Sequence, residues 1–317
     1  MKKLSFTIPC YGSALTIRDV ISEIHQKMSE RPELSYEIIT VNDCSPDNVL
    51  DVLRSIAASD HSVKVIDLAK NGGKHAALMA AYNHSSGDTV INIDDDGQCP
   101  LDKLWELTAP VENGYDIAIA RYPKKKQSAF KNFGSSINSL MARHLISKPK
   151  DLCLSNFSAV KKFVIDEMLN YKNAYPYIDG LFLRTTSKII NVDMEERDRA
   201  AGTGNYTLKK SLALWFNGFT AFSVKPLRLA TVLGLLCALI GFLAGIYVVV
   251  RKIIHPEILM GYSSLMAIQL FIGGMIMMML GLIGEYIGRI YISINNSPQF
   301  VIREIINDDE NEKEVNS

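Results

Sequence analysis

The sequence lacks an excess of charge of either sign and any clustering of cysteine. Among 317 residues, 34 Lys and Arg balance 34 Asp and Glu, so nothing in the composition indicates a nucleic-acid partner. The five cysteines are widely scattered, with no C-x-x-C pair and no spacing that suggests a zinc site or a disulfide framework. This usage fits a reducing compartment.

The first residues of the sequence lack the apolar run of a signal peptide. The last residues contain few apolar side chains. The stretch "MKKLSFTIPCYG" has no apolar run of signal-peptide length, so we expect the N-terminal part to stay in the cytoplasm. The last fifteen residues, "REIINDDENEKEVNS", are mostly acidic and polar, so we expect disorder there. No internal repeat is evident.

Charge is absent from two long runs near the other end. Residues 229–250 are uncharged over 22 positions and residues 258–284 over 27, each more than the roughly 20 residues that cross a bilayer core. The short linker "RKIIHPE" predicts a transmembrane hairpin, about 229–250 and 260–284. Flanking Lys and Arg favour cytoplasmic ends, although Arg251 and Lys252 in the linker weaken that count. Two buried helices of a soluble core are the alternative.

Residues 1 to about 200 alternate short β-rich runs with helix-compatible stretches. The runs are "LSFTIPC", "YEIITVND", "VKVIDLA", "DTVINIDDD" and "YDIAIAR", and the early helical stretches are 16–30, 46–59 and 74–86. This pattern predicts an α/β domain with a Rossmann-like, mostly parallel sheet. Because ligands gather beyond the carboxyl ends of such strands, the clusters "PCYG", "NDCSPD" and "DDDGQ" should converge on one crevice.

Between the domain and the hairpin, residues 206–228 mix Leu, Trp and Phe with Lys. This composition predicts an interfacial amphipathic segment, with a helix of the soluble domain as the alternative. The predicted organisation is a multi-pass protein of the cell membrane with both termini cytoplasmic. Its parts are a cytoplasmic α/β domain over 1–205, the interfacial segment over 206–228, the hairpin over 229–290 and a cytoplasmic tail over 291–317.

Asp94, Asp95 and Asp96 follow one of the predicted strands directly. Carboxylates this close repel one another unless a cation or protons offset them. A divalent metal such as Mg²⁺ or Mn²⁺, which prefers oxygen ligands, is the natural candidate. A solvated turn or a helix cap is the alternative.

Five motifs, "TIPCYG", "ITVNDCSPD", "KNGGKHAAL", "INIDDDGQCP" and "GLIGEYIGRIY", occur in this order between residue 4 and about 302. The ordered set resembles the family 2 glycosyltransferases of GT-A fold, in particular the membrane enzymes that load a sugar onto polyprenyl phosphate. The resemblance implies inverting transfer of one sugar from a nucleotide-sugar donor, with a UDP-sugar favoured, to polyprenyl (undecaprenyl) phosphate at the cytoplasmic face. It also implies a lipid bilayer partner, a possible homo-oligomer and a role in cell-envelope glycans.

The same resemblance assigns the candidate site residues. For the metal and catalysis it indicates Asp94, Asp96 and Gln98. For the nucleotide sugar it indicates Pro9, Tyr11, Asp43, Asn71, Lys74 and Asp95. For the acceptor and its phosphate it indicates Arg121, Lys131, Asn156, Arg199 and Tyr206.

Three departures from the family pattern bear on mechanism. Asn42 stands where an acidic residue is usual, and Gly204 stands where the family has Ser. Asn156 stands where the family often has an acidic residue that is proposed as the base. A polyprenyl phosphate is already largely anionic at neutral pH, so its oxygen can attack without strong base assistance. The alternatives are another lipid or lipid-linked glycan acceptor, a processive synthase, and a catalytically silent nucleotide-sugar-binding protein. His75 is expected to pack locally rather than to catalyse.

Overall fold

The computed structural model describes most of the α/β domain, one long helix and a C-terminal strand. The described residues are 2–122, 149, 151–195, 197, scattered positions from 232 to 254, 262–294 and 298–307. The chain divides into two compact units. One comprises Met1–Thr207 with Asn296–Ser317, and the other comprises Leu208–Asn295.

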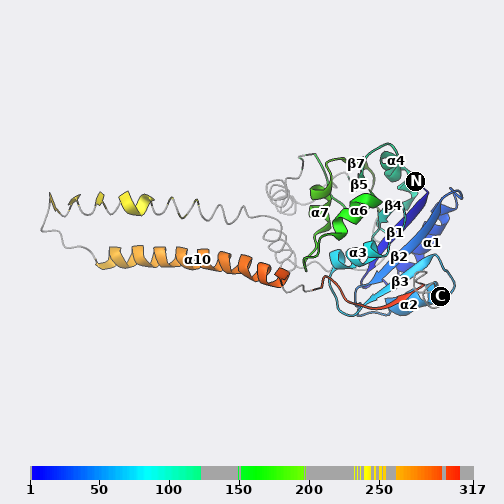
Figure 1. Ribbon diagram of the computed structural model, residues 1–317, viewed down its shortest axis with the longest axis horizontal. Helices are drawn as coiled ribbons and strands as arrows, with labels where there is room; N and C mark the ends of the chain where they lie inside the picture. The colour runs from blue at the N-terminus through cyan, green and yellow to red at the C-terminus, as the bar shows by residue number, and fades with distance from the viewer. Residues whose placement is uncertain are drawn as a thin grey trace. The chain divides into compact units, whose positions relative to one another are not determined.

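The first unit is built on a sheet with the strand order β7-β5-β6-β4-β1-β2-β3-β8. Figure 1 labels the strands β7, β5, β4, β1, β2 and β3 of this sheet. Its strands are β1 (Lys3–Cys10), β2 (Ser35–Asn42), β3 (Val63–Leu68), β4 (Thr89–Asn92), β5 (Ile117–Arg121), β6 (Ser158–Lys161), β7 (Ile189–Asp193) and β8 (Ile302–Ile306). β1 pairs in parallel with β2 and β4, β2 with β3, and β5 with β7. β6 and β8 run antiparallel to their neighbours. The predicted mostly parallel α/β sheet is confirmed.

Helices cover both faces of this sheet. They are α1 (Ile17–Met28), α2 (Val49–Ala57), α3 (Lys74–Asn83), the 3₁₀ turn η1 (Leu101–Lys103), α4 (Leu104–Glu112), α6 (Lys162–Leu169) and α7 (Ile178–Thr185). Apolar side chains of α1, α2 and α4 share one cluster with β1, whereas α3 packs on the opposite face against β2 and β3. The predicted stretches 16–30, 46–59 and 74–86 contain α1, α2 and α3, so these three predictions are confirmed.

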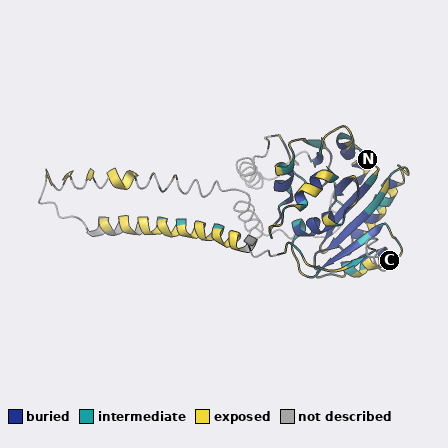
Figure 2. Cartoon of the chain, in the orientation of Figure 1, coloured by how far each residue is buried: buried dark blue, intermediate teal, exposed yellow. Residues whose placement is uncertain are grey.

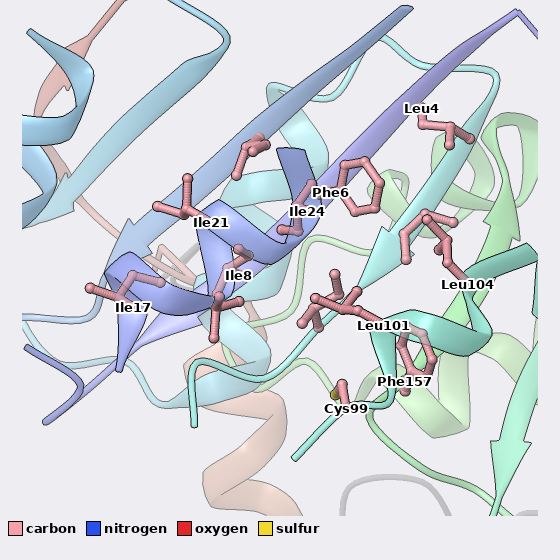
Figure 3. Close-up of a cluster of buried hydrophobic side chains, with 14 of the residues drawn as sticks. Leu4, Phe6, Ile8, Ile17, Ile21, Ile24, Cys99, Leu101, Leu104 and Phe157 are labelled. Carbon is pink, nitrogen blue, oxygen red and sulfur yellow. The ribbon is translucent and has the colours of Figure 1, made fainter. Parts of the chain in front are cut away.

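The alternation of side chains along β1 explains its central place in the core. Leu4, Phe6 and Ile8 are fully buried and belong to the cluster that includes Ile17 and Ile24 of α1 (Figure 3). Removing most of a buried aromatic side chain from such a core costs about 3–5 kcal/mol. The strand that carries the loop after Cys10 is therefore held rigidly.

Buried polar side chains tie β1, β4, β6 and α3 together on the other face. The Asn92 Oδ1 atom accepts hydrogen bonds from Thr7 Oγ1 at 2.7 Å and from Tyr82 Oη at 2.9 Å, and Asn92 Nδ2 donates to Ser158 Oγ at 2.9 Å. All four residues are buried, so a lost partner would leave an unsatisfied polar group. Since Asn92 ends β4, this network fixes the start of the loop that carries Asp94.

The C-terminal strand overturns one expectation. Disorder was expected from residue 303 onward, but residues 303–307 are ordered, and β8 pairs with β3. Phe300, Ile302 and Ile305 pack against the apolar cluster formed by β2, β3 and α3. The acidic residues further along dominate the composition of this segment and conceal a short strand. Residues 308–317 lie outside the described part of the chain.

The second unit contains α10 (Tyr262–Ile294), which covers most of the predicted span 260–284. Of the helices described, α10 alone is long and apolar enough to cross a membrane, over Phe271–Gly288, and that stretch is not buried (Figure 2). The described positions between 232 and 254 are also helical. The interfacial segment 206–228 lies outside the described residues, and the two-helix hairpin stays a prediction.

His75 at the start of α3 packs against α7, in agreement with its expected role. Its ring meets that of Tyr177 edge to face, with centroids 5.3 Å apart, and its Nδ1 atom lies 3.5 Å from the backbone nitrogen of Ile178. Burial, assisted by the positive charge of Lys74, lowers the pKa of His75 from 6.5 to about 4. The folded protein therefore holds this imidazole neutral.

A pH dependence of stability follows. Between about pH 6.5 and about pH 4 the unfolded chain binds a proton at His75 that the folded chain does not, so stability should fall as the pH falls through this window. His75→Gln should remove this component, and its unfolding temperature should depend less steeply on pH than that of the wild type. His61→Gln, at an exposed position, is the matched control. Parallel curves for wild type and His75→Gln would contradict the assignment.

Candidate active site

The loops that follow β1, β2 and β4 meet at one edge of the sheet. The backbone nitrogen of Tyr11 donates to Asp95 Oδ2 at 2.9 Å, and that of Gly12 donates to Ser45 Oγ at 2.8 Å. Pro9, within β1, precedes this loop. The expected convergence of the three polar clusters is therefore confirmed, because parallel strands place their carboxyl ends at a common edge.

Asp94 lies between two residues from distant parts of the chain. Lys74, the first residue of α3, donates from its ammonium group to Asp94 Oδ1. Asn156, just before β6, donates from Nδ2 to Asp94 Oδ2 at 2.7 Å. The structure thus joins residues predicted for the metal, the donor and the acceptor. The positive end of α3 and the Lys74 charge make this place favourable for an anion as well.

Asp95 has different surroundings from Asp94. Burial raises the pKa of Asp95 to about 6, and the charges of Asp94 and Asp96 act in the same direction. Thr16 Oγ1 donates to the backbone oxygen of Asp95 at 2.6 Å. The Asp95 carboxylate accepts the hydrogen bond from the backbone nitrogen of Tyr11, so Asp95 connects the loop after β4 to the loop after β1. Its predicted contact with the nucleotide sugar stays a prediction.

Asp96 and Gln98 are joined to a segment that the sequence reasoning missed. The backbone nitrogen of Gln98 donates to Asp96 Oδ1 at 3.1 Å. Gln98 also exchanges hydrogen bonds with the backbone of Arg197, at 3.4 Å through its Nε2 atom and at 3.3 Å through its backbone oxygen. The guanidinium of Arg197 pairs with Glu23 and Asp102. Nothing in the local sequence around Arg197 indicated this contact.

Asp43 connects the loop after β2 to the glycine loop before α3. Its Oδ1 atom accepts from the backbone nitrogen of Gly72 at 2.7 Å, and its Oδ2 atom accepts from that of Gly73 at 2.9 Å. Asn71 Nδ2 donates to the backbone oxygen of Asp43 at 2.9 Å. Gly73 has φ = 81°, a conformation that favours glycine. Burial raises the pKa of Asp43 even though both bonds stabilise its anion.

The expected role of Asp43 was a hydrogen bond to the nucleobase. The structure adds a second role, because both of its oxygens hold the glycine loop. A carboxylate offers about four lone-pair sites, so these bonds leave acceptor capacity. The base contact stays a prediction.

The turn "NDCSPD" is fixed by its own side chains. Asn42 Nδ2 donates to Asp67 Oδ1 at 2.7 Å, and Asn42 Oδ1 accepts from the backbone nitrogen of Ser45 at 3.2 Å. Cys44 has φ = 49°, a conformation that glycine adopts readily, and a side chain in this region costs roughly 1–2 kcal/mol. Asn42 therefore serves the shape of the turn.

The acceptor residues are only partly described. Arg121 pairs with Asp193 through two hydrogen bonds, one of them 2.8 Å long from its Nη2 atom. Together with Asp151, Arg184 and Asn191 it lines a cavity of about 660 Å³. The described residues that line this cavity do not include Asp94, Asp95 or Asp96. Lys131, Arg199 and Tyr206 lie outside the described residues.

The loop that carries Asp94, Asp95 and Asp96, called the carboxylate loop below, offers the oxygen ligands that Mg²⁺ or Mn²⁺ prefers. Within the described part of the chain, no three His, Cys, Asp or Glu side chains are grouped so that they could hold a metal. Mg²⁺ is commonly held by one or two carboxylates together with substrate phosphates and water, rather than by a complete protein cage. Asp94 and Asp96 are two such carboxylates, so they fit a metal that arrives with a diphosphate; that metal would replace the Lys74 ammonium as the cation on Asp94.

Comparison with known proteins agrees with this architecture. Residues 5–169 match the model of glycosyl transferase family 2, and residues 225–290 match that of the GtrB C-terminal hairpin. A glycosyltransferase of Bacillus subtilis, YkcC, is 33% identical over 94% of this chain and 93% of its own length. An undecaprenyl-phosphate 4-deoxy-4-formamido-L-arabinose transferase of Proteus mirabilis is 31% identical over 96% of this chain and 94% of its own.

Among solved structures, glucosyl-3-phosphoglycerate synthase from Mycobacterium tuberculosis, in complex with Mn²⁺, UDP and phosphoglyceric acid, shares the fold. It is 20% identical, covers 69% of this chain and 76% of its own, and gives a TM-score of 0.51. At this identity the likeness supports a GT-A-like fold alone. The family match and the full-length relatives lead to one conclusion: this chain belongs to glycosyltransferase family 2 and is a glycosyltransferase.

Proposed function

We propose that the protein is an inverting glycosyltransferase that moves one sugar from a nucleotide-sugar donor, favoured to be a UDP-sugar, to a polyprenyl phosphate such as undecaprenyl phosphate at the cytoplasmic face of the membrane. The product would serve cell-envelope glycans. The observation that carries the proposal is the meeting of Lys74, Asp94 and Asn156 at the sheet edge, in a chain with a long exposed apolar helix. The Proteus mirabilis relative, matched over nearly the whole chain, is named as an undecaprenyl-phosphate transferase.

The donor side of the site is built to accept a diphosphate. Lys74 and the N-terminal end of α3 present positive charge beside the carboxylate loop. A divalent metal held by Asp94 and Asp96, with Gln98 as a further oxygen donor, would offset the charge that develops on the departing diphosphate. Asp43 holds the glycine loop so that Lys74 begins its helix at the correct place.

The acceptor side requires no strong base. A phosphate oxygen attacks the anomeric carbon and forms the new carbon–oxygen bond, while the bond from that carbon to the diphosphate breaks and the diphosphate keeps the electron pair. The acceptor phosphate is already ionised at neutral pH, so no proton has to be removed. Asn156, an amide, can orient Asp94 by donating to it but cannot accept a proton from an alcohol.

The strand β8 supports an even number of membrane crossings. β8 follows α10 in the chain, yet it pairs with β3 of the α/β domain within the same compact unit. If α10 crosses the bilayer, the chain must cross once more between β7 and α10 to return to the same side. The apolar run 229–250 would supply the second crossing, which supports a hairpin with both ends on the same side of the membrane.

The acceptor is tested by comparing undecaprenyl phosphate with undecaprenol. The membrane-embedded protein is incubated with each lipid, a divalent metal and a panel of nucleotide sugars, and the lipid product is identified by mass. We expect product from the phosphate alone, because the alcohol does not ionise at neutral pH and the Asn156 amide cannot take its proton. Asn156→Asp should bring no gain, since a second carboxylate would face Asp94.

Equal or better use of the alcohol would contradict this mechanism. It would indicate a base elsewhere, and Asp179, in the first turn of α7, would be the first residue to mutate. Absence of any glycolipid product with the whole nucleotide-sugar panel would overturn the choice of a polyprenyl acceptor.

The metal is tested at the carboxylate loop. Asp94→Asn and Asp96→Asn should each lower kcat by at least about 100-fold, because losing an electrostatic group that acts on the transition state costs roughly 2.7–4 kcal/mol. Excess chelator should abolish transfer by the wild type, and added Mg²⁺ or Mn²⁺ should restore it. Asp51→Asn, on the exposed side of α2, is the matched control. Full activity in excess chelator would remove the metal from the mechanism.

The membrane topology is tested with reporters at three places. Fusions at the C-terminus and near Asp60 should both report a cytoplasmic location, because the two segments belong to one sheet unit. An insertion at His255, in the predicted linker of the hairpin, should report the opposite side. A C-terminus found outside would contradict the hairpin.

A further inference from the structure

The carboxylate of Asp67 is buried within the sheet and carries a charge that needs compensation. Asp67, in β3, is 1% exposed. Its Oδ1 atom accepts from Asn42 Nδ2 at 2.7 Å, and its Oδ2 atom accepts from Arg303 Nη1 of β8 at 2.9 Å. A buried carboxylate that loses its cationic partner is strongly destabilising, because its charge is then left without that compensation.

From Asp67 the hydrogen bonds continue toward the donor side. Asn42 Oδ1 accepts from the backbone nitrogen of Ser45, whose hydroxyl in turn accepts from the backbone nitrogen of Gly12 at 2.8 Å. The Ser45 hydroxyl also donates to Asp47 Oδ1 at 2.6 Å. One connected set of bonds therefore joins β8 to the turn after β2 and to the loop after β1.

The backbone of the C-terminal segment supports the neighbouring glycine loop. The nitrogen of Ala69 donates to the oxygen of Val301 at 2.8 Å, and Arg303 Nη2 donates to the oxygen of Ala69 at 3.3 Å. A Cβ atom placed on Gly72 would lie 3.4 Å from the backbone oxygen of Gln299. The segment that precedes β8 thus passes directly behind the loop that Asp43 binds.

The contact with Asp67 explains why position 42 carries an amide rather than an acidic side chain. The resembling family has an acidic residue at this position, but here the residue faces the buried Asp67 at hydrogen-bond distance. A carboxylate at position 42 would place a second negative charge in contact with Asp67, whereas the amide donates a hydrogen bond to the Asp67 carboxylate. The amide and the Arg303 cation therefore satisfy Asp67 together.

We propose that Arg303 is a positioning residue of the donor site: by pairing with Asp67 it holds Asn42, Ser45 and the glycine loop in the shape that receives the nucleotide. This inference rests on the proposed function, since it assigns the support of the same nucleotide site. It places a supporting residue of that site after the apolar helix α10 in the chain.

The test uses the full-length protein in lipid nanodiscs and measures the affinity for UDP and the other nucleoside diphosphates in the presence of Mg²⁺. Arg303→Met, which keeps the length of the side chain but removes the cation, should weaken nucleotide binding by at least about tenfold. Glu304→Gln is the matched control on the same strand, because Glu304 pairs with Arg54 at an exposed position. It should leave the affinity unchanged.

Rescue separates positioning from general damage. Asp67→Asn combined with Arg303→Met leaves no unpaired charge and keeps an acceptor for Asn42, so it should restore most of the affinity that Arg303→Met loses. Hydrogen exchange of the nucleotide-free protein gives a second readout. The backbone amides of Ser45, Gly72 and Gly73 should exchange faster in Arg303→Met than in the wild type or in Glu304→Gln.

The outcomes distinguish the two proposals. A wild type that binds no nucleotide overturns the proposed function, and this inference with it. A wild type that binds, together with an Arg303→Met variant of equal affinity, overturns the inference alone. Failure of the double variant to recover affinity and amide protection also overturns it, because the charge on Asp67 would then not be the cause.

Discussion

The constraint on which the site depends is the placement of carboxylates at the carboxyl edge of a parallel sheet. Strands that run in one direction bring their following loops together, and here those loops carry several acidic side chains that must each find positive or N–H partners. The Lys74 ammonium pairs with Asp94, the backbone nitrogen of Tyr11 donates to Asp95, and two glycine nitrogens donate to Asp43. Asp67, near the end of β3, accepts from Arg303 and Asn42. Together these bonds shape the site.

The arrangement separates two buried carboxylates that hold loops from the more exposed carboxylate of Asp94, which is proposed to bind the metal. Asp43 and Asp67 are buried and hold loops, whereas Asp94 is more exposed and lies between Lys74 and Asn156. The apolar cluster around β1 and the Asn92 network fix the strands beneath them, so the loops have a firm base. A metal and a diphosphate would meet a preorganised set of charges, which is the condition for strong electrostatic stabilisation of a transition state.

The chain leaves the α/β domain for an apolar helix and then returns to the sheet. The return is energetically secured by apolar packing of Phe300, Ile302 and Ile305 and by the ion pair of Arg303 with Asp67. In the chain, β8 follows the apolar helix α10 after a short segment. The final strand therefore belongs to the sheet of the α/β domain and is not a tail.

Local patterns in the sequence determined the α/β class, the strands β1 to β5, the first three helices and the apolar run that became α10. They did so because strand alternation, helix periodicity and long uncharged runs are properties of neighbouring residues. Three consecutive Asp residues after a strand marked the carboxylate loop, and a resemblance of ordered motifs assigned Lys74 and Asn156 to the same site, but their contacts with Asp94 came from the structure. Only the tertiary structure decided that Asp43 holds the glycine loop, that Arg197 meets Gln98 and that Arg303 reaches Asp67. Those partners are far apart in the chain, and the pairing of a buried charge depends on which strands become neighbours, which composition and spacing do not specify.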